Sequence, residues 1–166
     1  MLYPRRVARE LEPAGLEALK AALLHGGSLE ALSLYRRLTG AGLPEAKAFV
    51  DELQAAALER AGVGSGGVLP PRELLDLAAD LICAPGRGGG GQSRFSAAAA
   101  GYTEDERIAA LSLAQRMADR AYMLACDCRD GLYRADEAEY RLGFEAPGFS
   151  VESYRAAIQQ GLYASR

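Results

Sequence analysis

The chain has 166 residues, of which 49% are hydrophobic, and this is enough for one domain or two small ones with a modest core. The net charge of −3, from 19 basic and 22 acidic residues, provides no global positive field that would attract nucleic acid or an anionic membrane. Three cysteines cannot all pair, and no apolar run approaches the roughly 18 residues of a spanning helix. We therefore expect a cytoplasmic protein that has neither nucleic acid nor a membrane as a partner.

Apolar residues recur at helical spacing along most of the chain, and alternating strand patterns are nearly absent, so we predict an all-α protein. In the first half, Ser28 is a predicted N-cap, Gly40 a predicted left-handed helix end, and Pro44 suits the first turn of a helix. The sequence His25-Gly26-Gly27 is expected to separate two helices. The predicted helices of this half cover about 5–11, 14–24, 29–39, 44–57 and 73–83.

The second half is expected to form a three-helix unit. Thr103 and Glu106 make a capping-box pair at the start of a long helix that ends before Asp130-Gly131. A shorter helix over 135–142 follows, and Ser150 caps the last helix, with Phe149 packing on Tyr154 as a hydrophobic staple. The Gly/Ala/Ser-rich segment between the halves is typical of a flexible linker. The predicted organisation is two small helical modules, 1–84 and 103–166, joined by a linker over 85–102.

Three patterns are candidates for chemical sites. Residues 86–93 match two phosphate-binding patterns, but Gln92 stands where a P-loop needs lysine, and no strand precedes the loop. Cys126 and Cys128 point about 200° apart on a helix and do not easily chelate one ion, and His25 sits at a predicted helix end. We therefore expect no cofactor, no metal and no enzymatic activity. Carboxylate pairs formed in three dimensions leave a small enzyme with an unrecognised site as one alternative.

The string T-G-A-G-L-P-E-A-K at 39–47, with Val50 and Asp51 after it, makes residues 28–53 resemble the two-helix element in the C-terminal domain of the ribosomal large-subunit stalk protein. The resemblance implies a hairpin from an α/β domain whose face binds translational GTPases. Ser28 and Ser33 stand where the family has lysines, and no sheet-forming segments flank the hairpin. A stable helical hairpin reused as a structural or interaction unit, in a bacterial protein, is the expectation. The positions that match the family's binding face are Arg36, Leu43, Glu45 and Lys47.

Aromatic and acidic residues concentrate towards the C-terminal end of the sequence. The turn F-E-A-P-G-F at 144–149 contains Pro and Gly, so its apolar residues cannot all lie on one regular buried stripe. Exposed aromatic side chains ringed by carboxylates fit the anchor-and-rim pattern of protein interfaces. The predicted partner-binding residues are Asp136, Glu137, Glu139, Tyr140, Phe144, Glu145, Phe149 and Glu152.

The function predicted from these features is that of a non-enzymatic bacterial protein that binds another protein. An immunity protein or antitoxin that neutralises a cognate toxin by direct binding fits the small size, the acidic balance and the lack of a catalytic set. The alternative is a translation-associated protein that binds a ribosomal or elongation-factor partner through the stalk-like hairpin.

Overall fold

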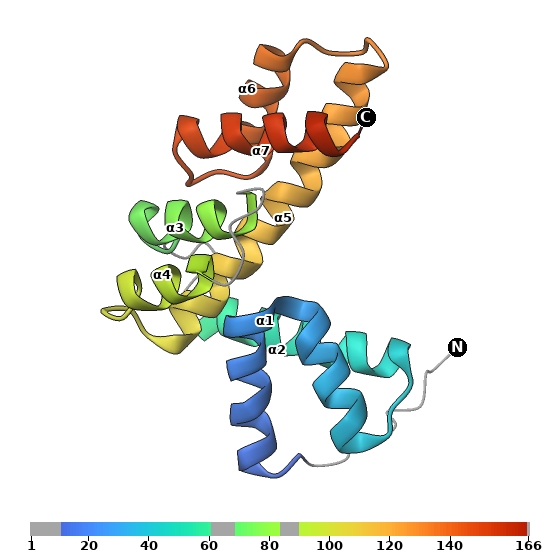
Figure 1. The fold of residues 1–166 in the computed structure, drawn as a ribbon, viewed down its shortest axis with the longest axis vertical. Helices are drawn as coiled ribbons and strands as arrows, with labels where there is room; N and C mark the ends of the chain where they lie inside the picture. The colour runs from blue at the N-terminus through green and yellow to red at the C-terminus, as the bar shows by residue number, and fades with distance from the viewer. Residues whose placement is uncertain (1–10, 61–68, 84–89, 166) are drawn as a thin grey trace. The chain divides into compact units, whose positions relative to one another are not determined.

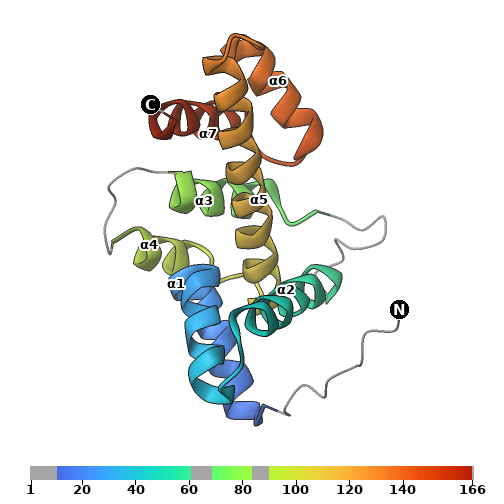
Figure 2. The same cartoon turned by 90° about the vertical axis from the view of Figure 1, so that its right-hand side faces the viewer.

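The computed structural model describes residues 11–60, 69–83 and 90–165, shown in Figure 1 and, turned by 90°, in Figure 2. These residues form α-helices and no strand, which confirms the all-α prediction. The chain divides into two compact units, Met1–Ala55 and Ala56–Arg166, which are described separately. The helices are α1 Pro13–Thr39, α2 Leu43–Arg60, α3 Arg72–Cys83, α4 Gly90–Ala98, α5 Glu104–Arg129, α6 Ala135–Glu145 and α7 Val151–Ala164.

Helix α1 folds back on itself. A Cβ placed on Gly15 would lie 3.7 Å from Cδ1 of Leu38, whereas a straight helix would separate these residues by roughly 34 Å. Figure 1 shows the bend between two legs, which correspond to the helices predicted before and after His25-Gly26-Gly27, where a pair of glycines permits a kink. Ser28 is not an N-cap as predicted, because it lies inside α1, and its hydroxyl accepts a hydrogen bond from Gln54 Nε2 at 3.2 Å.

The turn from α1 to α2 follows the prediction. Gly40 has φ 69°, and its N–H donates to the carbonyl of Arg36, so α1 closes with a left-handed residue. Pro44 lies in the first turn of α2, where an N–H would have no acceptor within the helix, so the missing N–H of proline costs no hydrogen bond. Tyr35, which is buried, stacks on Phe49 with 4.5 Å between ring centroids. This aromatic pair joins the second leg of α1 to α2.

In the second unit, α5 is the central helix on which α3, α6 and α7 pack. Its start is the predicted capping box, and α7 begins at the predicted N-cap Ser150. Helix α7 lies very close to α5 at Gly161, where a Cβ would be 2.9 Å from Ala125 Cβ and 3.0 Å from the carbonyl oxygen of Ala121. A second tie runs from Asp76 on α3, whose Oδ1 accepts hydrogen bonds from the N–H of Ser150 at 2.8 Å and from the hydroxyl of Ser153 at 2.7 Å.

The predicted linker over 85–102 is wrong for residues 90–98, which form α4; residues 84–89 lie outside the described part of the chain. Phe95 and Ala99 are spaced as i and i+4, and both are buried in the core with α3, α5, α6 and α7. The burial of this aromatic side chain, together with alanines of high helix propensity, favours a helix here. Because α3 contributes to the same core, it belongs with the C-terminal helices and not with the predicted module 1–84.

Replacing Thr103 by alanine is expected to lower the free energy of unfolding by about 1 kcal/mol, because it removes the acceptor for the Glu106 N–H. Glu106 accepts from the Thr103 N–H at 2.7 Å and from its hydroxyl at 2.8 Å, and these bonds lower the pKa of the carboxyl group. A lowered pKa stabilises the fold above the ordinary glutamate range, and that contribution is lost as the pH falls through the lowered value. Thr103→Ala removes the hydroxyl bond to the carboxylate, which titrates, and the N-cap bond, which does not. Urea unfolding across acidic pH should therefore show the difference between the two proteins narrowing without vanishing as the pH falls, and a constant difference would contradict this account.

Candidate partner-binding surface

Helix α6 has one buried and one exposed face. Ala138 and Leu142 are fully buried in the core of the second unit. On the outer side, Tyr140 and Phe144 lie one turn apart, and each is 82% exposed. Asp136 precedes them by another turn and is also exposed. We call the row Asp136, Tyr140 and Phe144 the α6 ridge, and its two aromatic side chains are the most exposed large hydrophobic residues of the described part of the chain.

Two open grooves flank the α6 ridge, one on each side, and the ridge residues line both. The turn-side groove lies towards the α5–α6 connection, and its further lining residues are Leu132, Tyr133, Glu137 and Arg141. The α7-side groove has as its further lining residues Glu139, Gly143, Val151 and Tyr154. Leu132 and Val151 are 66% and 58% exposed, so each groove adds an exposed aliphatic side chain to the two aromatic ones.

Phe149, predicted as a partner-binding residue, is a core residue. It is 5% exposed, and its ring meets that of Tyr154 edge to face with 6.0 Å between centroids, as expected for a hydrophobic staple. The N–H of Phe149 donates to the Tyr154 hydroxyl at 3.2 Å, and this hydroxyl donates to the carbonyl of Ala146 at 2.8 Å. Burial raises the pKa of Tyr154. The turn after α6 therefore exposes Phe144 and buries Phe149.

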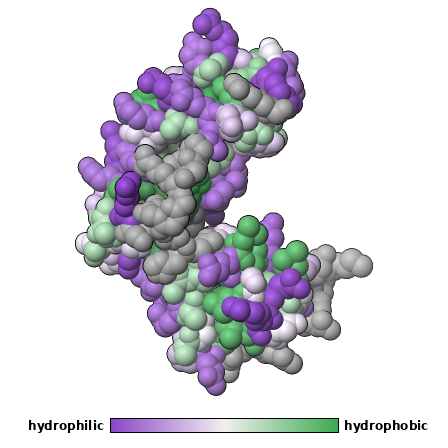
Figure 3. All heavy atoms as spheres, viewed as in Figure 1, coloured by the Kyte–Doolittle hydropathy of each residue, from purple (hydrophilic) through white to green (hydrophobic). Residues whose placement is uncertain are grey.

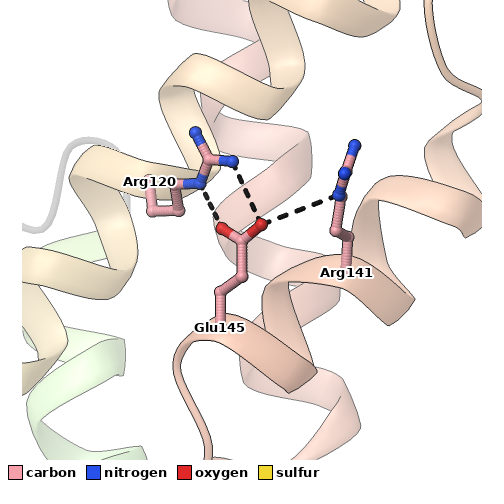
Figure 4. Close-up of polar contacts among 3 residues, drawn as sticks. All are labelled: Arg120, Arg141 and Glu145. Atoms are coloured by element: carbon pink, nitrogen blue, oxygen red, sulfur yellow. Dashed lines mark hydrogen bonds and ion pairs between the residues drawn. The ribbon is translucent and has the colours of Figure 1, made fainter.

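Arginines pair with the predicted carboxylates on this surface. Glu145 accepts two hydrogen bonds from the guanidinium of Arg120 on α5, one of them at 3.1 Å, and lies 3.6 Å from Arg141 Nε (Figure 4). The bond from Arg120 lowers the pKa of Glu145. Arg141 also lies over the ring of Tyr133, 4.7 Å from its centroid. Glu145 is thus part of a network that joins α5 to α6 and is not an isolated rim charge.

The remaining acids of the predicted set are also accompanied by arginines or by backbone donors. Glu139 lies 3.5 Å from Arg155, and Asp136 lies 3.3 Å from Arg134. Glu137 accepts a hydrogen bond from the N–H of Arg134 at 2.9 Å, and Glu152 lies in the first turn of α7, where the helix dipole favours a carboxylate. Figure 3 shows hydrophobic residues beside hydrophilic ones over the α6–α7 end of this unit. The carboxylates expected from the sequence are present around the aromatic side chains, and the arginines beside them make this a surface of mixed charge.

The residues that match the stalk-like pattern lie around one end of the α1–α2 hairpin. Arg36 is in the last turn of α1, and Leu43, Glu45 and Lys47 are at the start of α2. All four are exposed, and Leu43 is 56% exposed. Glu45 accepts a hydrogen bond from the N–H of Gly42 at 3.4 Å, which helps to close the turn. The structure therefore brings this alternative set together on the first unit.

All three cysteines are free thiols. Cys83 is buried, and burial, with a smaller effect of the Asp80 charge, raises the pKa of its thiol to about 11. Cys126 and Cys128 are half-buried on α5, and the Cys128 thiol lies 3.7 Å from the carbonyl oxygen of Arg134. Over 11–60, 69–83 and 90–165, no three His, Cys, Asp or Glu side chains are placed to hold a metal ion. The side chains of His25 and of the glycine-rich pattern at 86–93 lie outside the described part.

Comparisons of the chain with family models, with curated proteins and with solved structures return no match. Among the helices that the structure describes, none combines the length and apolarity needed to cross a bilayer. The candidate sites are two exposed surfaces, the α6 ridge and the end of the α1–α2 hairpin.

Proposed function

We propose that this chain is a non-enzymatic protein that binds another protein through the α6 ridge, and that in a bacterial cell it neutralises a toxin by direct binding. The observation that carries the proposal is the 82% exposure of two neighbouring aromatic residues, Tyr140 and Phe144, on a helix whose other face is buried in the core. Aromatic anchors on a rigid element lose little conformational entropy when they bind, so they supply much of the energy of protein interfaces.

The surroundings of the α6 ridge support a specific partner. The paired charges of Glu139 with Arg155, and of Glu145 with Arg120 and Arg141, form a polar rim around the aromatic side chains. Such a rim contributes to selectivity more than to affinity. The net charge of −3 favours a partner with a basic surface, and this is the basis for proposing a toxin that the chain masks.

Phe144→Ala is expected to weaken partner binding by about 2 kcal/mol, because it removes an exposed anchor without touching the core. Leu29→Ala is the matched control, since Leu29 is 81% exposed but lies on α1. The immobilised wild-type chain should capture one stoichiometric protein from native lysate, and biosensor kinetics should then rank the variants. The captured protein should arrest growth when expressed alone and should cease to do so when the wild-type chain is co-expressed. Equal binding by Phe144→Ala would refute the assignment of the site.

A second candidate is binding of a translation factor or ribosomal protein through the α1–α2 hairpin. It is favoured by the exposure of Leu43 beside Arg36 and Lys47 at the hairpin end. In the capture experiment it requires that Leu43→Ala, and not Phe144→Ala, abolishes binding. Recovery of ribosomes or elongation factors would select this candidate over toxin neutralisation.

A further inference from the structure

The charges beside the α6 ridge are arranged so that the surface complements itself. Glu137 and Arg141 are one helical turn apart, carry opposite charges, and both line the turn-side groove. If two such helices pack antiparallel about a two-fold axis that passes level with residue 139, the same side of each helix meets, and position 137 of one faces position 141 of the other. Isologous contacts of this kind repeat each pair twice. A uniformly acidic surface would repel its own copy, whereas this mixed one does not.

The exposed apolar area on this side is sufficient for a weak dimer. At 82% exposure, Tyr140 and Phe144 together present about 250–400 Å² of side-chain surface, to which Leu132 adds an aliphatic side chain that is 66% exposed. With the flanking Glu137 and Arg141, two copies bury on the order of 1,000 Å² in total. That area is at the lower limit for a specific interface, so the association is expected to be reversible and dependent on concentration.

We propose that the partner that covers the α6 ridge in the absence of another protein is a second copy of this chain, with the two α6 helices antiparallel over their turn-side grooves. Phe144 of each copy enters the groove that Leu132 and Tyr140 of the other copy line, and Glu137 of each copy pairs with Arg141 of the other. The inference rests on the proposed function, because the dimer covers the α6 ridge and so regulates the binding of a protein partner there. A toxin or other partner then binds only after the second copy dissociates.

The experiment is sedimentation velocity on the full chain from about 1 µM to about 500 µM, a range that spans the affinities of weak dimers. The wild type should sediment as a monomer–dimer equilibrium, and Phe144→Ala or Leu132→Ala should raise the dimer dissociation constant at least about tenfold. Arg141→Glu alone and Glu137→Arg alone should each sediment as monomers, because like charges then face each other. An equimolar mixture of these two variants should dimerise again, since both reciprocal pairs are restored in the mixed dimer.

The matched control is Glu139→Arg, a charge reversal on α6 that lies on the α7-side groove. Alone, Glu139→Arg should dimerise like the wild type, because it keeps both Glu137 and Arg141, and in an equimolar mixture with it Arg141→Glu should remain monomeric. A wild-type chain that stays monomeric across the range, or a mixture of the first two variants that stays monomeric while each keeps the wild-type melting temperature, would overturn the proposal. Either result leaves capture of a protein partner by the α6 ridge untouched. Conversely, a dimer with intact reciprocal pairs and no captured partner would refute the proposed function alone.

Discussion

Phe149→Ala is expected to lower the free energy of unfolding by about 3–5 kcal/mol, which is the usual cost of truncating a buried phenylalanine. Phe149 is 5% exposed and loses its edge-to-face contact with Tyr154 when truncated. The matched variant is Phe144→Ala, the same chemical change five residues earlier on an 82% exposed side chain, for which a change within about 0.5 kcal/mol is expected.

Urea unfolding followed by circular dichroism measures both variants under one condition. The pair separates a core role from a binding role, because Phe149→Ala loses stability and Phe144→Ala loses partner affinity. Equal destabilisation by the two substitutions would mean that Phe144 also packs in the core and would remove the basis of the α6 ridge.

Gly148→Ala is expected to cost about 3 kcal/mol for two separate reasons. Gly148 has φ 110°, a backbone conformation that strains any L-residue with a side chain by about 1–3 kcal/mol. A Cβ at this position would also lie 2.9 Å from Cδ1 of Leu69 and 3.0 Å from Cδ1 of Leu75, so the two leucines would have to move. Alanine also lowers the conformational entropy of the unfolded chain, and this stabilising effect offsets less than about 1 kcal/mol of the loss.

Two glycines in open space serve as controls for Gly148→Ala. Gly131 has φ 80°, and beyond its chain neighbours nothing lies within 4 Å of a Cβ added there, so Gly131→Ala measures the backbone strain alone. Gly101 has neither feature, and Gly101→Ala should be nearly neutral. The expected order of destabilisation in urea is Gly148 above Gly131 above Gly101. A Gly148→Ala variant no less stable than Gly131→Ala would show that the leucine contacts yield without cost.

Local features of the sequence predict most of the helix ends correctly. Three of these ends depend only on residues within one turn of the chain, so they can be predicted without tertiary information. They are the capping box at Thr103 and Glu106, the left-handed Gly40 and the N-cap Ser150. The all-α class follows for the same reason. Ser28 has the composition of an N-cap, but α1 continues through the bend, and the hydroxyl meets Gln54 from another helix.

The features that the sequence does not predict depend on contacts between distant residues. Phe144 and Phe149 flank the same Pro-Gly turn, and the packing of the surrounding helices decides which of them is buried. The pairing of Glu145 with Arg120 joins positions 25 residues apart, whereas its pairing with Arg141 has the i, i+4 spacing that a helix makes visible. The sequence does not predict helix α4, because glycines at its start and before it are typical of a linker. The burial of Phe95, which orders this helix, depends on the other helices of the core.

The buried thiol of Cys83 makes the closing of the second core measurable in real time. A thiol reagent reacts with the thiolate. While α3 is packed, a pKa of about 11 keeps the Cys83 thiol protonated, and burial keeps the reagent away from it. Labelling of Cys83 then proceeds only through transient opening, and its rate relative to that of an unfolded chain gives the free energy of that opening. Cys126 and Cys128 are half-buried on α5 and partly accessible in the folded state, so their labelling is the comparison against which the protection of Cys83 is measured.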